Sequence, residues 1–182
     1  MKANKSLLVA LVLSVFISCS ESKTNRDTVE NSKTFGLVIH GGAGSMEKDN
    51  YTEEQILEYE AVLNQALSEG YSSLEKNETA LDAIEKVIAI LEDSPLFNAG
   101  RGAVFTNNET NELDAAIMDG SNLKAGAVAG ITTVKNPIKL ARAVMDKSQH
   151  VMMIGEGAEE FAKTQNIEIV NPTYFKTEER LK

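Results

Sequence analysis

The sequence is poor in the residues that form disulfides and the common metal sites. Its 182 residues include one cysteine, Cys19, and two histidines, His40 and His150. A single cysteine excludes an internal disulfide framework. Zinc and iron sites usually combine several Cys and His ligands, so a site of that type is not expected. Each histidine is interpreted instead as a structural residue at the edge of a strand.

Several signatures of catalysis and nucleotide binding are also missing. There is no Gly-x-Ser-x-Gly segment for a serine nucleophile and no Gly-Lys-Ser/Thr phosphate loop. Gly155-Glu156-Gly157 lacks the third glycine of a dinucleotide fingerprint, and a turn between a strand and a helix explains it. The net charge is −9, and no cluster of Lys and Arg is visible, which argues against nucleic acid as a partner.

The N-terminal part of the chain is expected to lie outside the folded domain. Two lysines precede an apolar run over residues 7–17 that is short for a permanent membrane span, so residues 1–19 are interpreted as a signal peptide. Cys19 lies where a lipoprotein signal peptidase would leave a lipidated residue; a plain secretory signal with a chance cysteine is the alternative. The polar residues 20–34 then form a flexible tether. The expected location is the bacterial envelope, through a lipid anchor, or the periplasm.

Hydrophobic periodicity and turn residues predict an α+β domain over residues 35–182. Thr52 and Gln55 indicate a capping box, Gly70 is expected to end that helix, and Thr79 or Asn77 caps the next one. The strands cluster rather than alternate with helices, so a layered arrangement of a sheet and helices is predicted. Strands are expected at residues 35–40, 103–106, 113–118, 125–133, 151–154 and 167–170, and helices at residues 52–70, 79–93, 137–147 and 156–164.

Two glycine-rich segments are the strongest candidates for a functional site. Residues 40–44 (His-Gly-Gly-Ala-Gly) follow an apolar run, and residues 94–102 (Ser-Pro-Leu-Phe-Asn-Ala-Gly-Arg-Gly) follow an expected helix. Glycine lets the backbone approach a ligand or another segment closely. The amide of Asn98 can donate to an oxyanion or hold a nucleophile in place, or it can close a turn. The local sequence leaves both roles open.

Six segments occur in order along the chain: residues 40–44, 91–100, 112–120, 125–130, 135–137 and 150–159. Together they resemble the α-subunit half of the plant-type asparaginase and isoaspartyl peptidase family of N-terminal nucleophile hydrolases. The resemblance covers residues 35–182 and implies an αββα four-layer sandwich, incomplete in this chain. It also implies hydrolysis of L-asparagine, isoaspartyl dipeptides or both to aspartate, with no catalytic cofactor. The nucleophile of the family is a Thr made N-terminal by autocleavage, whose own α-amine acts as the base.

The resemblance also assigns roles to particular residues. Asn98 would lie beside the nucleophile, and Gly41 and Gly42 would line the loop that permits autocleavage. The nucleophilic Thr belongs to the family's β subunit and is expected beyond residue 182, so this segment alone is expected to be inactive. The implied partners are that β subunit, a small-molecule substrate and a second αβ unit in a dimer. A structural sodium ion would be held by the main-chain carbonyls of Leu91, Glu92, Ser94, Phe97, Ala99 and Arg101.

Other interpretations remain open. The chain could be a non-catalytic α half that serves as a binding or scaffolding lipoprotein, or a separately encoded chain could supply the nucleophile. The glycosylasparaginase branch of the family is a further alternative, although that branch carries a Trp near its first strand and this sequence has none. Activity on a glycosylated asparagine, compared with an isoaspartyl dipeptide, separates the two branches.

Overall fold

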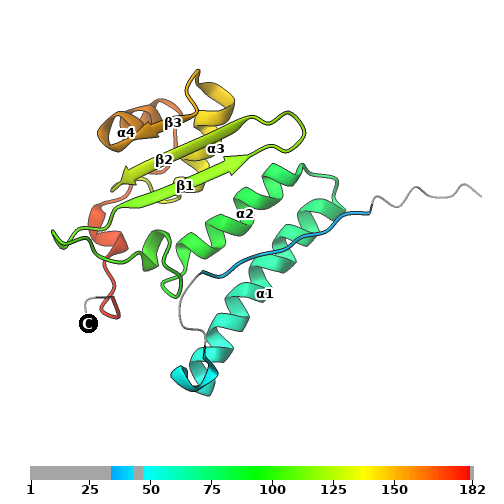
Figure 1. The fold of residues 1–182 in the computed structure, drawn as a ribbon, viewed down its shortest axis with the longest axis vertical. Helices are drawn as coiled ribbons and strands as arrows, with labels where there is room; N and C mark the ends of the chain where they lie inside the picture. The colour runs from blue at the N-terminus through cyan, green and yellow to red at the C-terminus, as the bar shows by residue number, and fades with distance from the viewer. Residues whose placement is uncertain (1–33, 43–46, 181–182) are drawn as a thin grey trace, which may run out of the picture. The chain divides into compact units, whose positions relative to one another are not determined.

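The computed structural model describes residues 34–42 and 47–180, most of which fall in the unit formed by residues 35–182. The predicted signal peptide, the Cys19 lipidation site and nearly all of the tether lie outside the described residues. The predicted α+β class is confirmed (Figure 1). The elements are α1 (Glu53–Glu75), α2 (Ala80–Asp93), β1 (Leu113–Met118), β2 (Ala125–Ile131), α3 (Pro137–Lys147), β3 (Met152–Ile154) and α4 (Gly155–Thr164), with 3-10 turns at Lys48–Asn50, Gly100–Gly102 (η2) and Pro172–Phe175 (η3).

Helix α1 begins where the sequence provides a capping box. The Thr52 hydroxyl accepts the backbone N–H of Gln55, and the Gln55 side chain accepts the N–H of Thr52, as predicted. The predicted end at Gly70 is wrong, because the helix continues past it. A Cβ at Gly70 would lie 2.6 Å from the side chains of both Leu37 and Val87. This glycine therefore serves close packing rather than helix termination.

Helix α2 also begins with a capping box and packs beside α1. The Thr79 hydroxyl accepts the N–H of Asp82, whose carboxylate accepts the N–H of Thr79 in return, so Thr79 rather than Asn77 is the cap. The helix ends at Asp93, and Ser94 adopts the extended conformation that a following proline favours. Among the described residues, no helix combines the length and apolar character needed to cross a membrane.

The three strands form one mixed sheet in the order β1-β2-β3. The β1-β2 pair is antiparallel, and a turn closed by backbone hydrogen bonds of Asp119 with Leu123 and Lys124 joins the two strands. The β2-β3 pair is parallel, with α3 as the connection between them. Side chains alternate between the two faces along each strand. The register places Ala115, Val128 and Met153 in one row across the sheet, and Ala116, Ala127 and Met152 in the next row.

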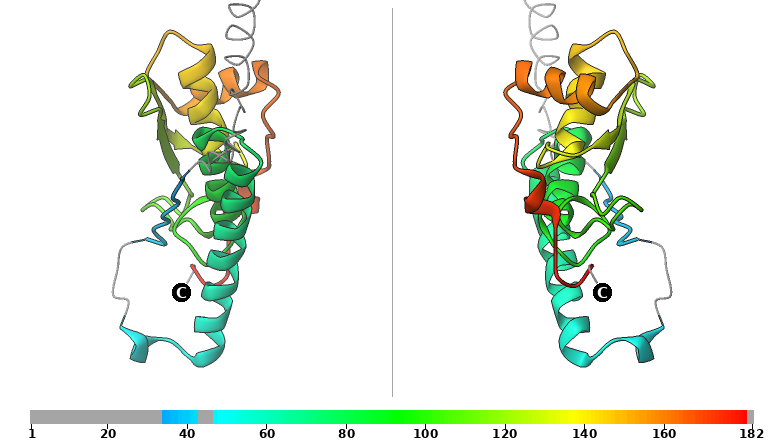
Figure 2. Two further views of the ribbon diagram at one scale, coloured as in Figure 1. Left: turned by 90° about the vertical axis from the view of Figure 1, so that its right-hand side faces the viewer. Right: turned by 90° about the vertical axis from the view of Figure 1, so that its left-hand side faces the viewer.

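Helices cover one face of this sheet (Figure 2). Helix α3 packs on β1 and β2, and α4 packs on β2. A Cβ at Gly126 would lie 2.1 Å from the carbonyl oxygen of Ala141, so the small residues of this strand let α3 pack closely on the sheet. On the opposite face, nothing in the described part of the chain covers Met118, Met152 and Ile154, which are 53%, 53% and 66% exposed.

The predicted strand at residues 35–40 is wrong, although its pattern is that of a strand. Leu37 and Ile39 pack against the apolar cluster between α1 and α2, whereas Val38 is 93% exposed. Strand structure requires a ladder of backbone hydrogen bonds with a neighbour. Among residues 34–42 and 47–180, no strand pairs with this segment. It runs along α1 and α2 without regular secondary structure (Figure 1).

Two further predicted strands are also wrong, because other groups bind their backbones. In residues 103–106, the N–H of Val104 donates to the Asn98 side chain, and the Asn111 amide donates to the carbonyls of Ala103 and Val104. Residues 167–170 contribute one isolated bridge between strands, at position 169, rather than a strand. The helix at residues 137–147 and the strand at residues 113–118 are confirmed with the predicted bounds.

Candidate functional site

The segment of residues 94–102 forms a loop anchored by one aromatic side chain. The loop follows the C-terminus of α2 and ends in η2. Phe97 is 5% exposed and packs in a cluster with Ala66, Val87 and Leu91 from the two long helices. Its ring meets that of Tyr59 edge-on at 5.6 Å between centroids. Because Phe97 is buried and packed, it fixes the position of the backbone at the neighbouring Asn98, which lies on the surface.

The glycines of this loop lie where the backbone folds tightly against itself. Gly100 has a φ of +50°, and a Cβ there would lie 2.2 Å from the main-chain oxygen of Glu92. A Cβ at Gly102 would lie 2.1 Å from the oxygen of Phe97 and 2.5 Å from that of Pro95. Since no other residue fits at these positions without moving backbone, the two glycines set the shape of the loop.

Asn98 is exposed, and its amide has a fixed orientation. Its Oδ1 accepts the backbone N–H of Val104 at 2.9 Å, which is the turn-closing role that the sequence left open. This hydrogen bond leaves the Nδ2 group as the donor, with no hydrogen bond to any other described residue. The two roles considered from the sequence are therefore compatible, because they use opposite ends of one amide.

The structure brings the two glycine-rich segments together. A Cβ at Gly41 would lie 3.3 Å from the ring of Phe97 and 3.6 Å from the side chain of Leu63, so the backbone of the first segment rests on the anchor of the second. Gly42 has a φ of +123°, a conformation that favours glycine. Ala43 and Gly44 lie outside the described residues. Gly41 thus packs on the ring of Phe97, the residue that precedes Asn98 in the chain.

The main-chain oxygens predicted to hold sodium fit a hard cation. Carbonyl oxygens are ligands that such cations prefer, and those of Leu91, Phe97 and Ala99 each accept one backbone N–H within the loop and keep a second lone pair. Those of Glu92 and Phe97 line the two places where a Cβ would collide. No group of three or more His, Cys, Asp or Glu side chains in the described part of the chain could hold a metal ion, so a site here would be built from backbone.

The sequence analysis missed the buried carboxyl group of Glu92. The residue is 3% exposed, and its Oε1 accepts the N–H of Ile138 at 3.0 Å, at the first turn of α3. Burial raises the pKa of this carboxyl to about 8, against the opposite effect of hydrogen bonds from Ile138 and Asn136. The group is therefore mostly protonated at pH 7. A signal was present, because Ile84, Ile88 and Glu92 recur at helical spacing on one face of α2.

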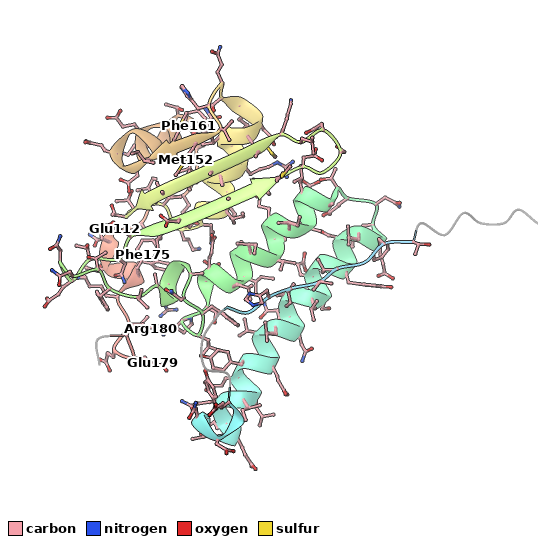
Figure 3. The ribbon with its side chains drawn as sticks, in the orientation of Figure 1. Glu112, Met152, Phe161, Phe175, Glu179 and Arg180 are labelled. Atoms are coloured by element: carbon pink, nitrogen blue, oxygen red, sulfur yellow. The ribbon has the colours of Figure 1, made fainter. Side chains whose placement is uncertain are left out.

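Two further residues that sequence reasoning missed, Tyr59 and Arg180, bind the loop from distant parts of the chain. Arg180 comes from the C-terminal segment (Figure 3). The Tyr59 hydroxyl in α1 donates to the oxygen of Leu96 at 3.0 Å. The Arg180 guanidinium donates from Nε to the oxygen of Gly102 at 2.9 Å and from Nη2 to that of Leu96 at 3.3 Å. No local pattern connects these residues, since Arg180 and Leu96 are 84 positions apart.

Neither histidine makes any of the contacts with the loop that are described above. His40 and His150 are both exposed, and neither belongs to a strand, so their expected position at strand edges is wrong. The Ser148 hydroxyl accepts the N–H of His150, which orders the turn before β3. Gly155 has a φ of +50° and opens α4, which confirms the interpretation of residues 155–157 as a turn between a strand and a helix.

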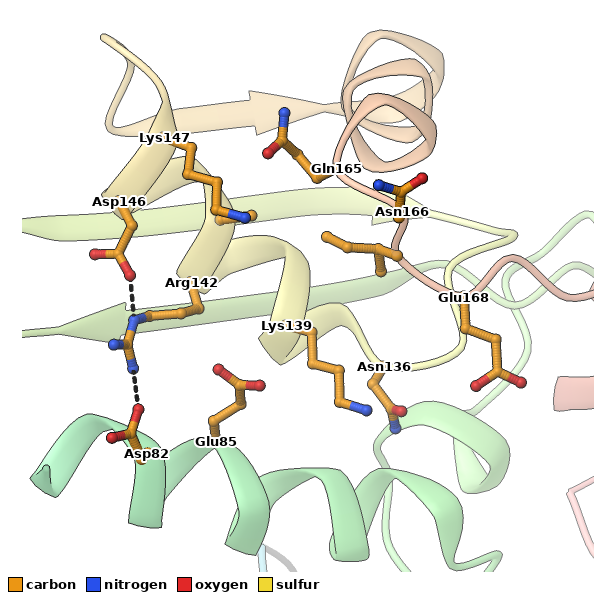
Figure 4. Close-up of a pocket in the computed structure, with 12 residues that line it drawn as sticks. Asp82, Glu85, Asn136, Lys139, Arg142, Asp146, Lys147, Gln165, Asn166 and Glu168 are labelled. Atoms are coloured by element: carbon orange, nitrogen blue, oxygen red, sulfur yellow. Dashed lines mark hydrogen bonds and ion pairs between the residues drawn. The ribbon is translucent and has the colours of Figure 1, made fainter. Parts of the chain in front are cut away.

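A separate hollow of about 450 Å³ lies between α2, α3 and the segment after α4 (Figure 4). Arg142 in α3 spans it, with ion pairs to Asp82 at 3.5 Å and to Asp146 at 2.5 Å. Lys139 and Glu168 also line it. Of the residues predicted for a functional site, none lines this hollow. Its charged side chains join two helices, and the glycine-rich loops remain the candidate site.

Comparisons with known proteins identify the family of the chain. The sequence model of a family described as Asparaginase matches residues 33–182. The isoaspartyl peptidase of Escherichia coli strain K12 is 50% identical over 141 residues, which are 78% of this chain and 44% of that protein. The plant-type L-asparaginase of Pyrococcus furiosus is 49% identical over 146 residues, 80% of this chain and 45% of that protein. The chain thus spans less than half of the length of these relatives.

Proposed function

The chain belongs to the asparaginase family, and on this premise we propose that it forms the first part of an enzyme that hydrolyses L-asparagine, isoaspartyl dipeptides or both to aspartate. One observation carries the proposal from the structural side. Gly41 rests on Phe97, and the next residue, Asn98, is exposed and has its Oδ1 held by the N–H of Val104, which leaves Nδ2 as the donor. The glycine-rich backbone thus packs on the residue next to a hydrogen-bond donor, and acyl transfer is stabilised by such preorganised donors.

The proposed nucleophile is a Thr beyond residue 182 that autocleavage makes N-terminal. Its hydroxyl oxygen attacks the side-chain carbonyl carbon of the substrate, and its own α-amine accepts the hydroxyl proton. The C–N bond then breaks, and ammonia or an amine leaves with that proton. Water attacks the resulting ester, which releases aspartate and restores the Thr hydroxyl. Asn98 donates from Nδ2 beside the nucleophile, and Gly41 and Gly42 leave room for the autocleavage loop.

The rest of the proposed enzyme covers the open face of the sheet. We propose a β subunit whose own sheet packs there and completes an αββα sandwich, with two αβ units in a dimer. The exposed Met118, Met152 and Ile154 support this arrangement, because apolar patches on a folded protein commonly mark a contact surface. Export and lipidation at Cys19 also remain proposals. Mass spectrometry of the N-terminal peptide after detergent extraction tests the lipid directly.

A structural sodium ion in the loop of residues 94–102 is a further part of the proposal. It would neutralise converging carbonyl dipoles and supply no chemistry to the reaction. The chain would contribute the tight turn at Gly100 and Gly102. The main-chain oxygens of Glu92 and Phe97 lie close to these two glycines. The melting temperature in sodium chloride, compared with choline chloride at equal ionic strength, tests the ion without any activity measurement.

The decisive experiment expresses the coding sequence that contains this chain in its natural extent. We expect two fragments with Thr at the new N-terminus, ammonia release from L-asparagine, and aspartate release from an isoaspartyl dipeptide. Asn98→Asp keeps the oxygen that binds Val104 but removes the Nδ2 donor, so kcat should fall about a hundredfold or more. Asn107→Asp adds the same charge at an exposed turn and should leave kcat unchanged.

Each other outcome rejects the proposal in a specific way. A protein that stays uncleaved and is inactive on L-asparagine, on an isoaspartyl dipeptide and on a glycosylated asparagine supports a non-catalytic binding role. Activity restricted to a glycosylated asparagine places the chain in the glycosylasparaginase branch. Full activity of Asn98→Asp removes this residue from the neighbourhood of the nucleophile.

A further inference from the structure

We propose that Arg180 is a positioning residue that holds the loop of residues 94–102 in the shape that presents Asn98. The proposal rests on the function proposed above only for its catalytic consequence. The contact itself is direct: one guanidinium binds the oxygen of Gly102 at 2.9 Å and that of Leu96 at 3.3 Å. These two carbonyls flank Asn98, one on each arm of the loop.

The shape of the guanidinium suits this task. Its donors lie in a rigid plane, so two carbonyls bound to one guanidinium are held at a fixed separation. A lysine in the same place could bind only one of them well, because its ammonium group is a single point of charge. Arg180 is half-buried, so its hydrogen bonds compete only partly with water. The two arms of the loop are therefore tied together by a residue that belongs to neither.

The same carbonyl is held from a second direction. The oxygen of Leu96 also accepts the hydroxyl of Tyr59 from α1 at 3.0 Å. A carbonyl oxygen has two lone pairs and can accept both donors at once. The ring of Tyr59 packs edge-on against Phe97. The carbonyl of Leu96 is thus held by Tyr59 from α1 and by Arg180 from the C-terminal segment. Of these two side chains, only Arg180 also binds Gly102.

The segment that carries Arg180 is itself anchored in the fold. Phe175 is fully buried in the core beneath the sheet. The adjacent Tyr174 donates its hydroxyl to Asp93 at 3.4 Å, and the guanidinium of Arg101 lies 5.9 Å above the centre of its ring. We call residues 172–180 the clasp. It contacts the loop near its start at Asp93 and near its end at Arg101 and Gly102.

The clasp and the proposed sodium ion use different atoms. Arg180 binds the oxygens of Leu96 and Gly102, and neither belongs to the set of carbonyls assigned to the cation. The two positive groups can therefore act on one loop at the same time. Arg180 would hold the two arms of the loop at a fixed separation, and Gly100 and Gly102 would set the shape of its turn.

The test is amide hydrogen exchange of the natural-length protein, comparing wild type with Arg180→Ala, Arg180→Lys and a matched control. Lys176→Ala is that control, because it removes a positive charge from the exposed part of the clasp without a bond to the loop. In Arg180→Ala, the amides of residues 99–104 should exchange about tenfold to a hundredfold faster, since charge-assisted hydrogen bonds shift local opening by such factors. Arg180→Lys should fall between, and Lys176→Ala should match wild type.

A kinetic measurement separates positioning from a general structural role. In a protein with asparaginase activity, Arg180→Ala should lower kcat about tenfold and leave KM within about twofold, because the loop presents Asn98 rather than the substrate-binding groups. Arg180→Lys should restore part of kcat. Unchanged exchange at residues 99–104 in Arg180→Ala overturns the proposal, as does faster exchange with unaltered kcat. An inactive wild type rejects the proposed function alone, and exchange then decides on the clasp.

Discussion

Glu159 fastens α4 to the end of β2, and its removal should have a measurable cost. One carboxylate oxygen, Oε1, accepts the N–H of Thr132 at 2.6 Å, the hydroxyl of Thr132 at 2.9 Å and the N–H of Thr133 at 3.0 Å. Hydrogen bonds to a charged group contribute roughly 1.5–3 kcal/mol each, and the half-buried setting of Glu159 reduces their sum. We expect Glu159→Ala to destabilise the protein by about 2–4 kcal/mol.

Two variants refine this prediction. Glu159→Gln keeps an oxygen acceptor and loses only the charge, so its cost should be about 1 kcal/mol. Glu160→Ala changes the next residue of the same helix, which is exposed and makes no hydrogen bond or ion pair in the described structure, and it should stay within about 0.5 kcal/mol of wild type. Thermal melts of the natural-length protein, followed by circular dichroism, should show a drop of about 5–10 °C for Glu159→Ala.

The pH dependence of this effect has a definite sign. Burial alone would raise the pKa of Glu159, but the hydrogen bonds from Thr132 and Thr133 outweigh it and lower that pKa below its ordinary value. The folded state therefore favours the carboxylate, and its contribution is complete above the ordinary pKa of about 4.3 and disappears as the pH falls further. The gap in stability between wild type and Glu159→Gln should close below about pH 4. Equal melting temperatures for Glu159→Ala and Glu160→Ala at pH 7 would refute the reasoning.

Two further predictions concern the candidate site. Glu92 has a pKa of about 8 in the fold against about 4.3 in an unfolded chain, so wild-type stability should decrease from about pH 4.5 to pH 8, by no more than about 5 kcal/mol. Glu92→Gln should flatten this decrease in urea titrations, and identical slopes would contradict the assignment. Gly102→Ala should cost at least about 2 kcal/mol because its Cβ meets backbone oxygens, whereas Gly157→Ala, with nothing within 4 Å, should be neutral or stabilising in the same titrations.

Helices were predictable from the sequence where their start signals are local. The hydroxyls of Thr52 and Thr79 bind backbone three residues away, and Pro137 occupies the first turn of α3, so each signal lies beside the structure it determines. The predicted helix end at Gly70 was wrong because it relied on the local sequence alone. The neighbours of Gly70 in space, Leu37 and Val87, are distant in the sequence, and local rules therefore assigned it to a helix end.

Strands depend on partners that local patterns do not specify. Residues 35–40 have the alternation of a strand, but strand structure also requires a neighbour to bind. The sequence located both glycine-rich segments and Asn98, because glycines and an amide mark tight backbone. It did not locate Arg180, whose contacts with Leu96 and Gly102 cross about 80 residues and carry no periodic signal. Long-range contacts of this kind arise only from the folded chain.

The segment of residues 35–40 is held against α1 and α2 by its side chains. Phe35 lies 5.1 Å from Tyr71 between ring centres, and Leu37 and Ile39 are held by the same pair of helices. Ordering a backbone residue opposes folding by about 1–2 kcal/mol, and here side-chain packing offsets that cost without any ladder. A strand that pairs with this segment would form hydrogen bonds to a backbone that side-chain packing already orders. The pairing would therefore cost little further conformational entropy.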